Sequence, residues 1–348
     1  MRILVTGNCG YIGSLLTPAL EQAGHEVVGM DTSLYRGSVF GEHHTHVPTL
    51  EMDIRDVQRQ DLAGIDSVIH LAGLSNDPLG AYRPELTDAI NHRAAVHLAR
   101  LAKDAGAKRF LFASSCSNYG AAGDEFLDEG SPFRPVTPYG KSKADTEFAL
   151  STLADDEFSP TYLRASTAYG VSPLLRFDLV LNNLVAWAYT TARVHLKSDG
   201  TPWRPIVHIR DIALAYVVAA AAPREIIHDR AFNVGSTAEN YRISELAKIV
   251  SDAVPGSVVE YAPDAGPDKR CYRVDCNRIA RELPGFKPQW TARRGVMELL
   301  DAFRAVGITL EDVEGARYSR ITHIRQLIEQ NALSDELRWI DEPRRTAS

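Results

Sequence analysis

Short apolar runs alternate with helical repeats of apolar residues along the first half of the chain. Residues 2–5 form an apolar run that predicts a buried strand, and residues 14–23 carry apolar positions at helical spacing up to Gly24. Residues 26–30 predict a second strand, at whose carboxyl end Asp31 lies. A strand, a helix and another strand in this order predict two parallel strands joined by a right-handed crossover.

The same alternation continues to about residue 165. Further strands are expected at 66–71, 109–114 and 161–165, further helices at 89–105 and 141–153, and a short third strand just before Asp53. Strands that alternate with helices predict an α/β fold with a Rossmann-type, doubly wound parallel sheet that is covered by helices on both faces.

Beyond about residue 166 the pattern becomes less regular, which predicts a smaller C-terminal α/β substrate lobe. We expect helices at 179–191, 211–222, 244–253 (with Ser244 as N-cap) and 291–306, strands at 193–196 and 231–234, and a charged, partly helical tail from Gly307. One helix and one strand of this region are expected to return to the main sheet. The predicted domains are 1–165 plus about 207–235 for the main sheet, and about 166–206 plus 236–348 for the smaller lobe.

The composition excludes several classes of protein. The 348 residues carry a formal net charge of −7, which does not provide the cationic surface that binding to nucleic acid or to a membrane surface requires. No apolar run approaches the length of a transmembrane helix, and the first residues, MRILVTG, are too short an apolar run for a signal peptide. We therefore expect a cytoplasmic protein.

Cysteine and histidine do not form a pattern that predicts a metal centre. Of the 4 cysteines, only Cys271 and Cys276 are close in sequence, and they lack both the spacing and the nearby histidines of a zinc site. The histidine-rich residues 43–46 are interpreted as a polar loop. No metal site and no disulfide framework are expected.

The loop after the first strand has the chemistry of a phosphate site. Gly7, Gly10 and Gly13 permit a tight turn and a close approach of the backbone to a pyrophosphate, and the next helix offers free N–H groups. Asp31 follows at the spacing of a residue that accepts hydrogen bonds from the adenosine ribose hydroxyls. Because a carboxylate repels a 2′-phosphate, the cofactor expected is NAD rather than NADP, a preference that the nearby Arg36 softens.

Asp53 has two interpretations. It follows the expected third strand and is therefore placed to contact the adenine amino group, or it is the N-cap of a helix that begins before Val57.

A second set of residues has the chemistry of proton transfer. If a helix begins near Pro138, Tyr139 and Lys143 lie one turn apart on the same face. A nearby ammonium lowers the pKa of a tyrosine, which could then exchange a hydroxyl proton while hydride moves to or from a nicotinamide. Ser115 follows a strand of the same sheet and offers a hydroxyl at the edge where ligands bind. Taken alone, the tyrosine and lysine are more often a chance pair on a helix, and the segment around Ser115 has the character of an ordinary polar loop.

Together, these segments resemble the extended short-chain dehydrogenase/reductase superfamily, specifically its NAD-dependent nucleotide-sugar epimerase/dehydratase branch of UDP-glucose 4-epimerase-like enzymes. The matching segments occur in family order and are residues 6–13, 53–56, 70–73, 114–120, 138–143 and 204–211. The resemblance implies an NAD-binding domain, a nucleotide-sugar-binding lobe and a nucleoside-diphosphate sugar bound between them.

The resemblance also implies roles for individual residues. Tyr139 would be the general acid/base, Lys143 its electrostatic partner and a ribose ligand, and Ser115 the donor to the substrate hydroxyl. The implied cofactor-binding residues are Gly7, Gly10, Tyr11, Ile12, Gly13, Asp31, Asp53, Ile54, Leu71, Ala72, Gly73, Asn91, Ala113, Tyr139 and Lys143. The implied substrate-binding residues are Ser115, Cys116, Ser117, Thr167, Asn183, Arg204 and Arg270. For Arg204 and Arg270, a surface ion pair is the alternative.

Departures from the family pattern narrow the reaction. Dehydratases of the branch carry Asp-Glu where this chain has Cys116 and Ser117, and its decarboxylases carry Glu at the second of these positions. Thr167 also stands where the family often has Asn. We therefore expect an NDP-sugar epimerase that acts through a transient keto-sugar. The alternatives are an NAD(P)H-dependent NDP-4-ketosugar reductase and a non-catalytic NAD-binding scaffold.

The resemblance further implies a homodimer. The helices expected at 89–105 and 141–153 correspond to the pair that many relatives use as a four-helix interface. The alternative is that Ala94, Ala95, Leu98 and Ala102 face this protein's own sheet.

Overall fold

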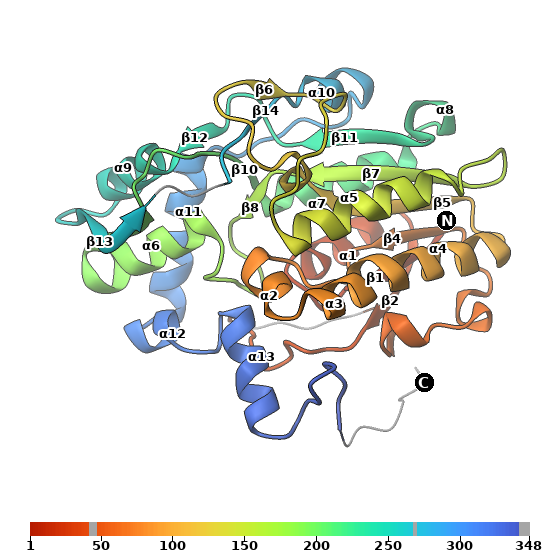
Figure 1. Ribbon diagram of the computed structural model, residues 1–348, viewed down its shortest axis with the longest axis horizontal. Coiled ribbons are helices and arrows are strands. Elements are labelled where there is room, and N and C mark those ends of the chain that lie inside the picture. Colours follow the sequence, from red (N-terminus) through yellow and green to blue (C-terminus); the bar gives the residue numbers. More distant parts are fainter. Residues whose placement is uncertain (42–46, 267–269, 341–348) are drawn as a thin grey trace.

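A 7-stranded parallel sheet forms the centre of the protein (Figure 1). The computed structural model describes residues 1–41, 47–266 and 270–340. From edge to edge the strands are β11 (Arg230–Val234), β7 (Ser159–Ala165), β5 (Arg109–Ser115), β4 (Ser67–His70), β1 (Arg2–Thr6), β2 (Glu26–Asp31) and β3 (Thr49–Glu51). The chain runs outward from β1 to β3 and then returns to β4 on the other side of β1. This reversal confirms the doubly wound sheet and creates the crevice in which such folds bind ligands.

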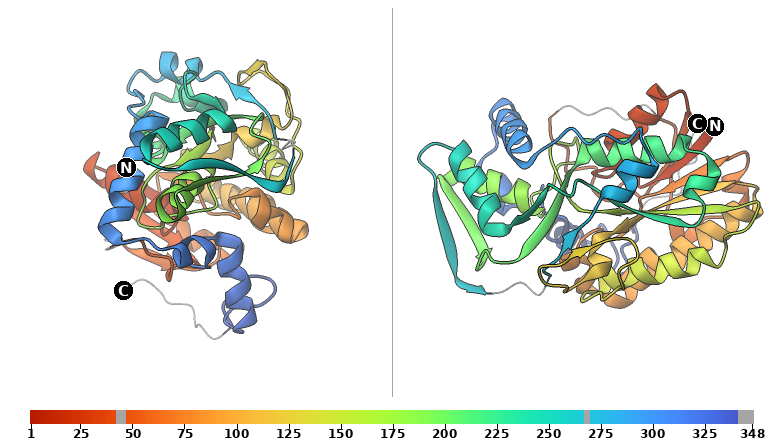
Figure 2. Two further views of the ribbon diagram at one scale, coloured as in Figure 1. Left: turned by 90° about the vertical axis from the view of Figure 1, so that its left-hand side faces the viewer. Right: turned by 90° about the horizontal axis from the view of Figure 1, so that it is seen from above.

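Helices cover both faces of the sheet (Figure 2). Along β1, Ile3 and Val5 pack on one side and Leu4 on the other, as the alternation of side chains in a strand requires. The first side is covered by α1 (Gly13–Gln22) and α7 (Ile209–Ala221), and the second by η3 (Asp88–Ala94), α4 (Ala95–Asp104) and α5 (Pro138–Ser151). The single helix expected at 89–105 therefore begins with a π-helical turn, η3.

The smaller lobe has its own apolar core. Its longer elements are α6 (Val180–Thr191), β9 (Arg193–Ser198), α9 (Ile243–Ala253), β13 (Val258–Gly266) and α11 (Ala292–Val306), beside the sheet of β8 (Thr167–Tyr169), β10 (Trp203–His208) and β12 (Asn240–Arg242). The prediction of Ser244 as an N-cap is wrong. Helix α9 begins earlier, and the Arg242 N–H that precedes it donates to Glu245 at 2.6 Å.

The remaining elements are short. They are η1 (Ile54–Asp56), η2 (Arg59–Leu62), α2 (Asp77–Tyr82), α3 (Pro84–Thr87), η4 (Cys116–Tyr119), β6 (Phe126–Leu127), α8 (Arg224–Ile227), β14 (Arg273–Val274), α10 (Asn277–Glu282), α12 (Leu310–Glu314) and α13 (Arg320–Glu329). Among the helices of the described residues, none combines the length and the apolar character needed to cross a bilayer.

The domain boundaries stay a prediction, but the structure shows where the later segments pack. Helix α7 lies against α1, and β11 pairs with β7 in the main sheet. The predicted boundaries place the tail from Gly307 in the smaller lobe. The tail also runs back to the main sheet, where Trp339 Nε1 donates to the carbonyl of Thr32 at 2.7 Å.

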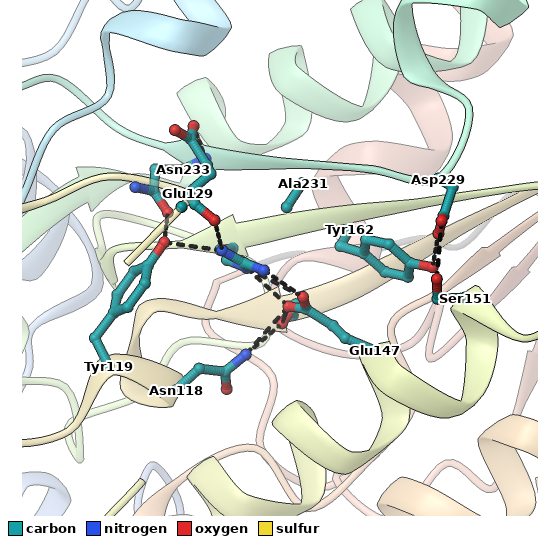
Figure 3. A network of polar contacts seen from close by, with 12 residues as sticks. Asn118, Tyr119, Glu129, Glu147, Ser151, Tyr162, Asp229, Ala231 and Asn233 are labelled. Carbon is teal, nitrogen blue, oxygen red and sulfur yellow. Dashed lines mark hydrogen bonds and ion pairs between the residues drawn. The ribbon is translucent and has the colours of Figure 1, made fainter. Parts of the chain in front are cut away.

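A buried ion pair links α5 to the sheet. Arg164 on β7 donates through Nη2 to Glu147 on α5 at 2.6 Å, and both side chains are more than nine-tenths buried. Glu147 also accepts hydrogen bonds from Ser114 and from Asn118, whose amide points toward it in Figure 3. The guanidinium donates in addition to Tyr119 Oη at 3.0 Å. Each charge is therefore compensated within one network.

Removing one partner of this pair should strongly destabilise the fold. Arg164→Met leaves the Glu147 carboxylate buried without its cation, so we expect a loss of about 3–5 kcal/mol in the free energy of unfolding. Urea denaturation measures this loss. Lys141→Met is the matched control, because it breaks the exposed Lys141–Asp145 pair of the same helix and should cost about 0.5 kcal/mol or less. Equal losses for the two variants would contradict the prediction.

Candidate functional site

A large cleft opens at the carboxyl ends of β1, β4 and β5, between the main sheet and the smaller lobe. Its volume is about 1200 Å³. Most of the residues predicted for a cofactor line this cleft, namely Gly7, Gly10, Tyr11, Ile12, Gly13, Asp31, Asp53, Ile54, Leu71, Ala72, Gly73, Ala113, Tyr139 and Lys143. The structure therefore gathers residues from distant segments of the chain at one edge of the sheet.

The glycine loop fits a phosphate group. Gly7 has a φ of 75°, a conformation that favours glycine, and a Cβ on Gly13 would lie 2.2 Å from the Gly7 carbonyl oxygen. The loop can therefore stay tight only with glycine at both positions. Helix α1 begins at Gly13, so the positive end of its dipole lies at the loop, and the Ser14 N–H donates to the Gly10 carbonyl of the loop itself. This is the geometry that a dinucleotide diphosphate requires.

Asp31 and Asp53 border the same part of the cleft. Asp31 accepts hydrogen bonds from the backbone N–H groups of Cys9 at 2.9 Å and Ser33 at 2.8 Å, and burial raises its pKa. Asp53 caps η1 by accepting from the Arg55 N–H, as its second interpretation predicts. Burial alone would raise the pKa of Asp53, but its hydrogen bonds and ion pair with Arg55 hold that pKa below its ordinary value.

Ser115, Tyr139 and Lys143 meet in this cleft. Ser115 is the last residue of β5, and the other two lie in the first turns of α5, which Thr137 caps by accepting from the Gly140 N–H. The Lys143 Nζ lies 5.8 Å from the centre of the Tyr139 ring and 4.7 Å from that of Phe112. The helix start near Pro138 therefore places both side chains as predicted.

The expected effect of Lys143 on Tyr139 is not found. Burial raises the pKa of Tyr139 to about 12, and its hydrogen bond with Ser115 only partly opposes this. Burial also lowers the pKa of Lys143 to about 8, against the opposite effect of Glu147. The lysine therefore does not offset the desolvation of the tyrosine in the protein alone.

Two predicted ligand-binding residues lie outside the cleft. Asn91 is fully buried, and its side chain binds both backbone groups of Leu74, so it fixes the loop that lines the cleft instead of facing it. Cys116 points into the apolar core, where its Sγ donates to the carbonyl of Arg164. Ser115 is the last residue of β5, whereas Cys116 is the first residue of η4, where the chain turns, and only Ser115 lines the cleft. We correct both assignments.

The other residues predicted for the substrate all line the cleft, namely Ser115, Ser117, Thr167, Asn183, Arg204 and Arg270. The Arg204 Nη1 donates to the carbonyl of Arg270 at 2.6 Å, so the two arginines are neighbours. Arg204 is buried. Arg270 does form an ion pair, with Asp77 at 2.6 Å.

The sequence did not identify a polar cluster opposite the glycine loop. Arg176 forms a buried ion pair with Asp178 at 2.8 Å and donates to Ser75, while Asn76 donates to Asp178. All four residues line the cleft. In the sequence, Arg176 and Asp178 are recognisable only as a charged pair inside an irregular apolar loop, residues 174–178. That pattern gives no role to either side chain.

Within the described ranges, no group of three or more His, Cys, Asp or Glu side chains is arranged to hold a metal ion. The histidine-rich residues 43–46 lie outside those ranges.

Comparison with known proteins identifies the family. The model of the NAD dependent epimerase/dehydratase family matches residues 3–235, which include the glycine loop, the Ser-Tyr-Lys residues and β11. The chain belongs to this family. Its members are NAD-dependent enzymes of the extended short-chain dehydrogenase/reductase type that act on nucleotide sugars. The cleft that the glycine loop lines fits this cofactor.

Relatives in this family carry out different reactions. The chain is 29% identical over 335 residues to the UDP-glucose 4-epimerase of Bacillus subtilis, an alignment that covers 86% of this chain and 94% of that protein. It is 26% identical over 311 residues to UDP-glucuronic acid decarboxylase 4 of Arabidopsis thaliana, with 87% and 69% covered. The solved structure of MoeE5 in complex with UDP-glucuronic acid and NAD has a TM-score of 0.76 at 26% identity and covers 88% of this chain and 99% of its own. Family membership therefore does not identify the reaction, which must be inferred from the residues of the site.

Proposed function

We propose that this protein is an NDP-sugar epimerase that acts through a transient keto-sugar. The observation that carries the proposal is the convergence of Ser115, Tyr139 and Lys143 in the cleft that the glycine loop also lines, with no carboxylate at positions 116 and 117. A hydroxyl, a phenol and an ammonium suffice to move one proton during hydride transfer. The binding of UDP-sugars by MoeE5 supports a nucleoside-diphosphate sugar as substrate.

NAD, when bound, would supply the hydride acceptor and then return the same hydride. The Tyr139 oxygen would take the proton of the sugar hydroxyl as the ketone forms, and would give it back as the ketone is reduced from the opposite face. Ser115 would hold the reacting oxygen by a hydrogen bond. Arg204 and Arg270 would bind the diphosphate of the sugar nucleotide, because guanidinium groups match phosphate oxygens in charge and geometry.

The same cleft argues against elimination and decarboxylation. Ser117 carries only a hydroxyl, and Cys116 lies in the core. One carboxylate, Asp77, influences Tyr139 from the adjoining helix α2, but it already accepts hydrogen bonds from Thr137 and Arg270 at 2.6 Å each. Among the described residues, positions 116 and 117 therefore supply no carboxyl group for those reactions, and Asp77 is already engaged.

The second candidate is a reductase of NDP-4-ketosugars, which would use the same three side chains. Asp31 favours the epimerase because it excludes a 2′-phosphate and so favours NAD, which an epimerase regenerates in every turnover.

Proton NMR of the purified protein with UDP-, GDP-, CDP- and dTDP-sugars and substoichiometric NAD tests the proposal. A sugar isomer formed in excess over NAD would support the epimerase and identify the nucleotide. Loss of water or of carbon dioxide from the sugar would contradict it. Turnover only with a ketosugar and stoichiometric reduced cofactor would favour the reductase.

Tyr139→Phe removes only the proton-transfer oxygen. We expect kcat to fall by about 100- to 10,000-fold, which is the usual contribution of a general acid/base, while the affinity for NAD changes little. Steady-state kinetics and a binding titration measure the two quantities. Tyr82→Phe, on α2 and outside the residues that line the cleft, is the matched control. Turnover that survives in Tyr139→Phe would refute the assignment.

The pH dependence should report Lys143. If its ammonium is needed to stabilise the Tyr139 phenolate, kcat/KM falls as the pH rises through about 8, where burial places the pKa of Lys143. In Lys143→Arg the fall near pH 8 should disappear, because a guanidinium stays charged there. A fall with the same midpoint in both proteins would assign it to another group.

The homodimer stays a prediction, as does the cytoplasmic location. The apolar residues that suggested the interface, Ala94, Ala95, Leu98 and Ala102, are all buried against this protein's own sheet. The exposed positions of η3 and α4 include Arg93, His97 and Arg100. On the second helix of the predicted interface, α5, Phe148 is exposed. Sedimentation showing only a monomer at micromolar concentration would reject the dimer.

A further inference from the structure

The C-terminal segment, residues 309–340, closes one side of the cleft. It lies alongside the residues that come directly after β2. The His323 Nε2 lies 3.0 Å from the Leu34 carbonyl oxygen, and Trp339 donates to Thr32. Farther along, Arg338 forms ion pairs with Asp53 and Asp56. In Figure 1 this segment runs below β2, at the lower edge of the molecule. The contacts hold α13 beside the part of the cleft that Asp31 borders.

Arg320, the first residue of α13, is the cation that this segment places in the cleft wall, which Glu314 of α12 also lines. It is only 2% exposed, and its guanidinium lies over the ring of Tyr35 at 3.8 Å. Nη2 donates to the carbonyl of Leu174 at 2.9 Å. Nη1 is buried and has no hydrogen-bond partner among the residues that the structure describes.

The charges around Arg320 do not balance it. Asp31 is near enough to influence it but is occupied by two backbone N–H groups, and Asp178 is paired with Arg176. Burial lowers the pKa of Arg320 to about 10, so the guanidinium remains charged at neutral pH. A buried cation with an unpaired N–H is costly unless an anionic oxygen reaches it.

We propose that Arg320 binds the diphosphate of NAD from the side opposite the glycine loop. Two neighbours locate it along the dinucleotide. Asp31, at one side, marks the adenosine ribose. At the other side is Arg176, whose charge acts on Arg320. The Arg176 guanidinium lies 5.9 Å from the ring of Tyr11 in the glycine loop. Between ribose and glycine loop, the diphosphate is the group that carries anionic oxygens. The inference rests on NAD binding in this cleft, which the family establishes, and is independent of the sugar reaction.

Arg320→Met on the full-length chain tests the proposal by equilibrium binding. The ligands are NAD, ADP, NADP and adenosine, measured by calorimetry or, for weak binding, by competition. We expect Kd to rise about 10- to 100-fold for NAD and ADP, which is the usual range for a charge-assisted hydrogen bond, and to change little for adenosine. Arg320→Lys should recover part of the loss. Arg325→Met, at an exposed position of the same helix, is the matched control and should bind all four ligands normally.

The other outcomes overturn the proposal in distinguishable ways. A loss confined to NADP would place Arg320 at the 2′-phosphate, and an equal loss for adenosine would show a structural role. Unchanged binding would show no role at all. If Arg320→Met does not fold, Arg320→Gln and Arg320→Lys are compared by the ratio of ADP to adenosine affinity. Failure of the native protein to bind NAD would instead refute the cofactor assignment.

Discussion

The buried ion pair between Glu147 and Arg164 is the interaction on which the geometry of the site depends. Glu147 lies one turn after Lys143 on α5, and its carboxylate also binds Ser114, the neighbour of Ser115 on β5. A shift of α5 along the sheet would therefore separate two buried charges as well as the three side chains of the site. The cost of leaving either charge unpaired makes that alignment stiff. A reaction that needs a proton acceptor in one place gains from this stiffness, because positioning contributes much of the rate enhancement.

The sequence predicted the main sheet well because its signals are local. The strands β1, β2, β4, β5 and β7 and the helix between β1 and β2 follow from apolar periodicity and glycine punctuation within a few residues. What it missed depends on contacts between distant segments. The N-cap of α9 fell on Arg242 instead of Ser244 because β12 runs into that helix, where Ser244 N donates to the carbonyl of Gly200. The return of the tail to β2 depends on the contact between Trp339 and Thr32, which no local pattern encodes.

The same distinction separates the site residues. Gly7, Gly13 and Asp31 belong to one strand–helix–strand unit, and the helical spacing of Tyr139 and Lys143 follows from Pro138, so these positions could be read from short segments. Asn91 and Cys116 have suitable chemistry, but Asn91 lies in a π-helical turn and Cys116 begins the turn η4 after β5. Whether their side chains face the cleft depends on these turns. Arg320 could not be found at all, since only the folded chain brings it beside Asp31.

The contacts that residues 309–340 make beside the cleft bear on the reaction. An epimerase must keep its reduced cofactor until the hydride returns, whereas a reductase releases an oxidised cofactor in each turnover. Residues 309–340 cover the dinucleotide side through hydrogen bonds at Thr32 and Leu34 and ion pairs at Asp53 and Asp56. Escape of NAD past this segment would require several of these contacts to break together, which slows its release. The same segment also packs on the smaller lobe, where α12 contacts α6 and the Phe177 N–H donates to the carbonyl of Tyr318 at 2.9 Å. A cofactor that is held in this way can return its hydride to the same sugar, which an epimerase requires and a reductase does not.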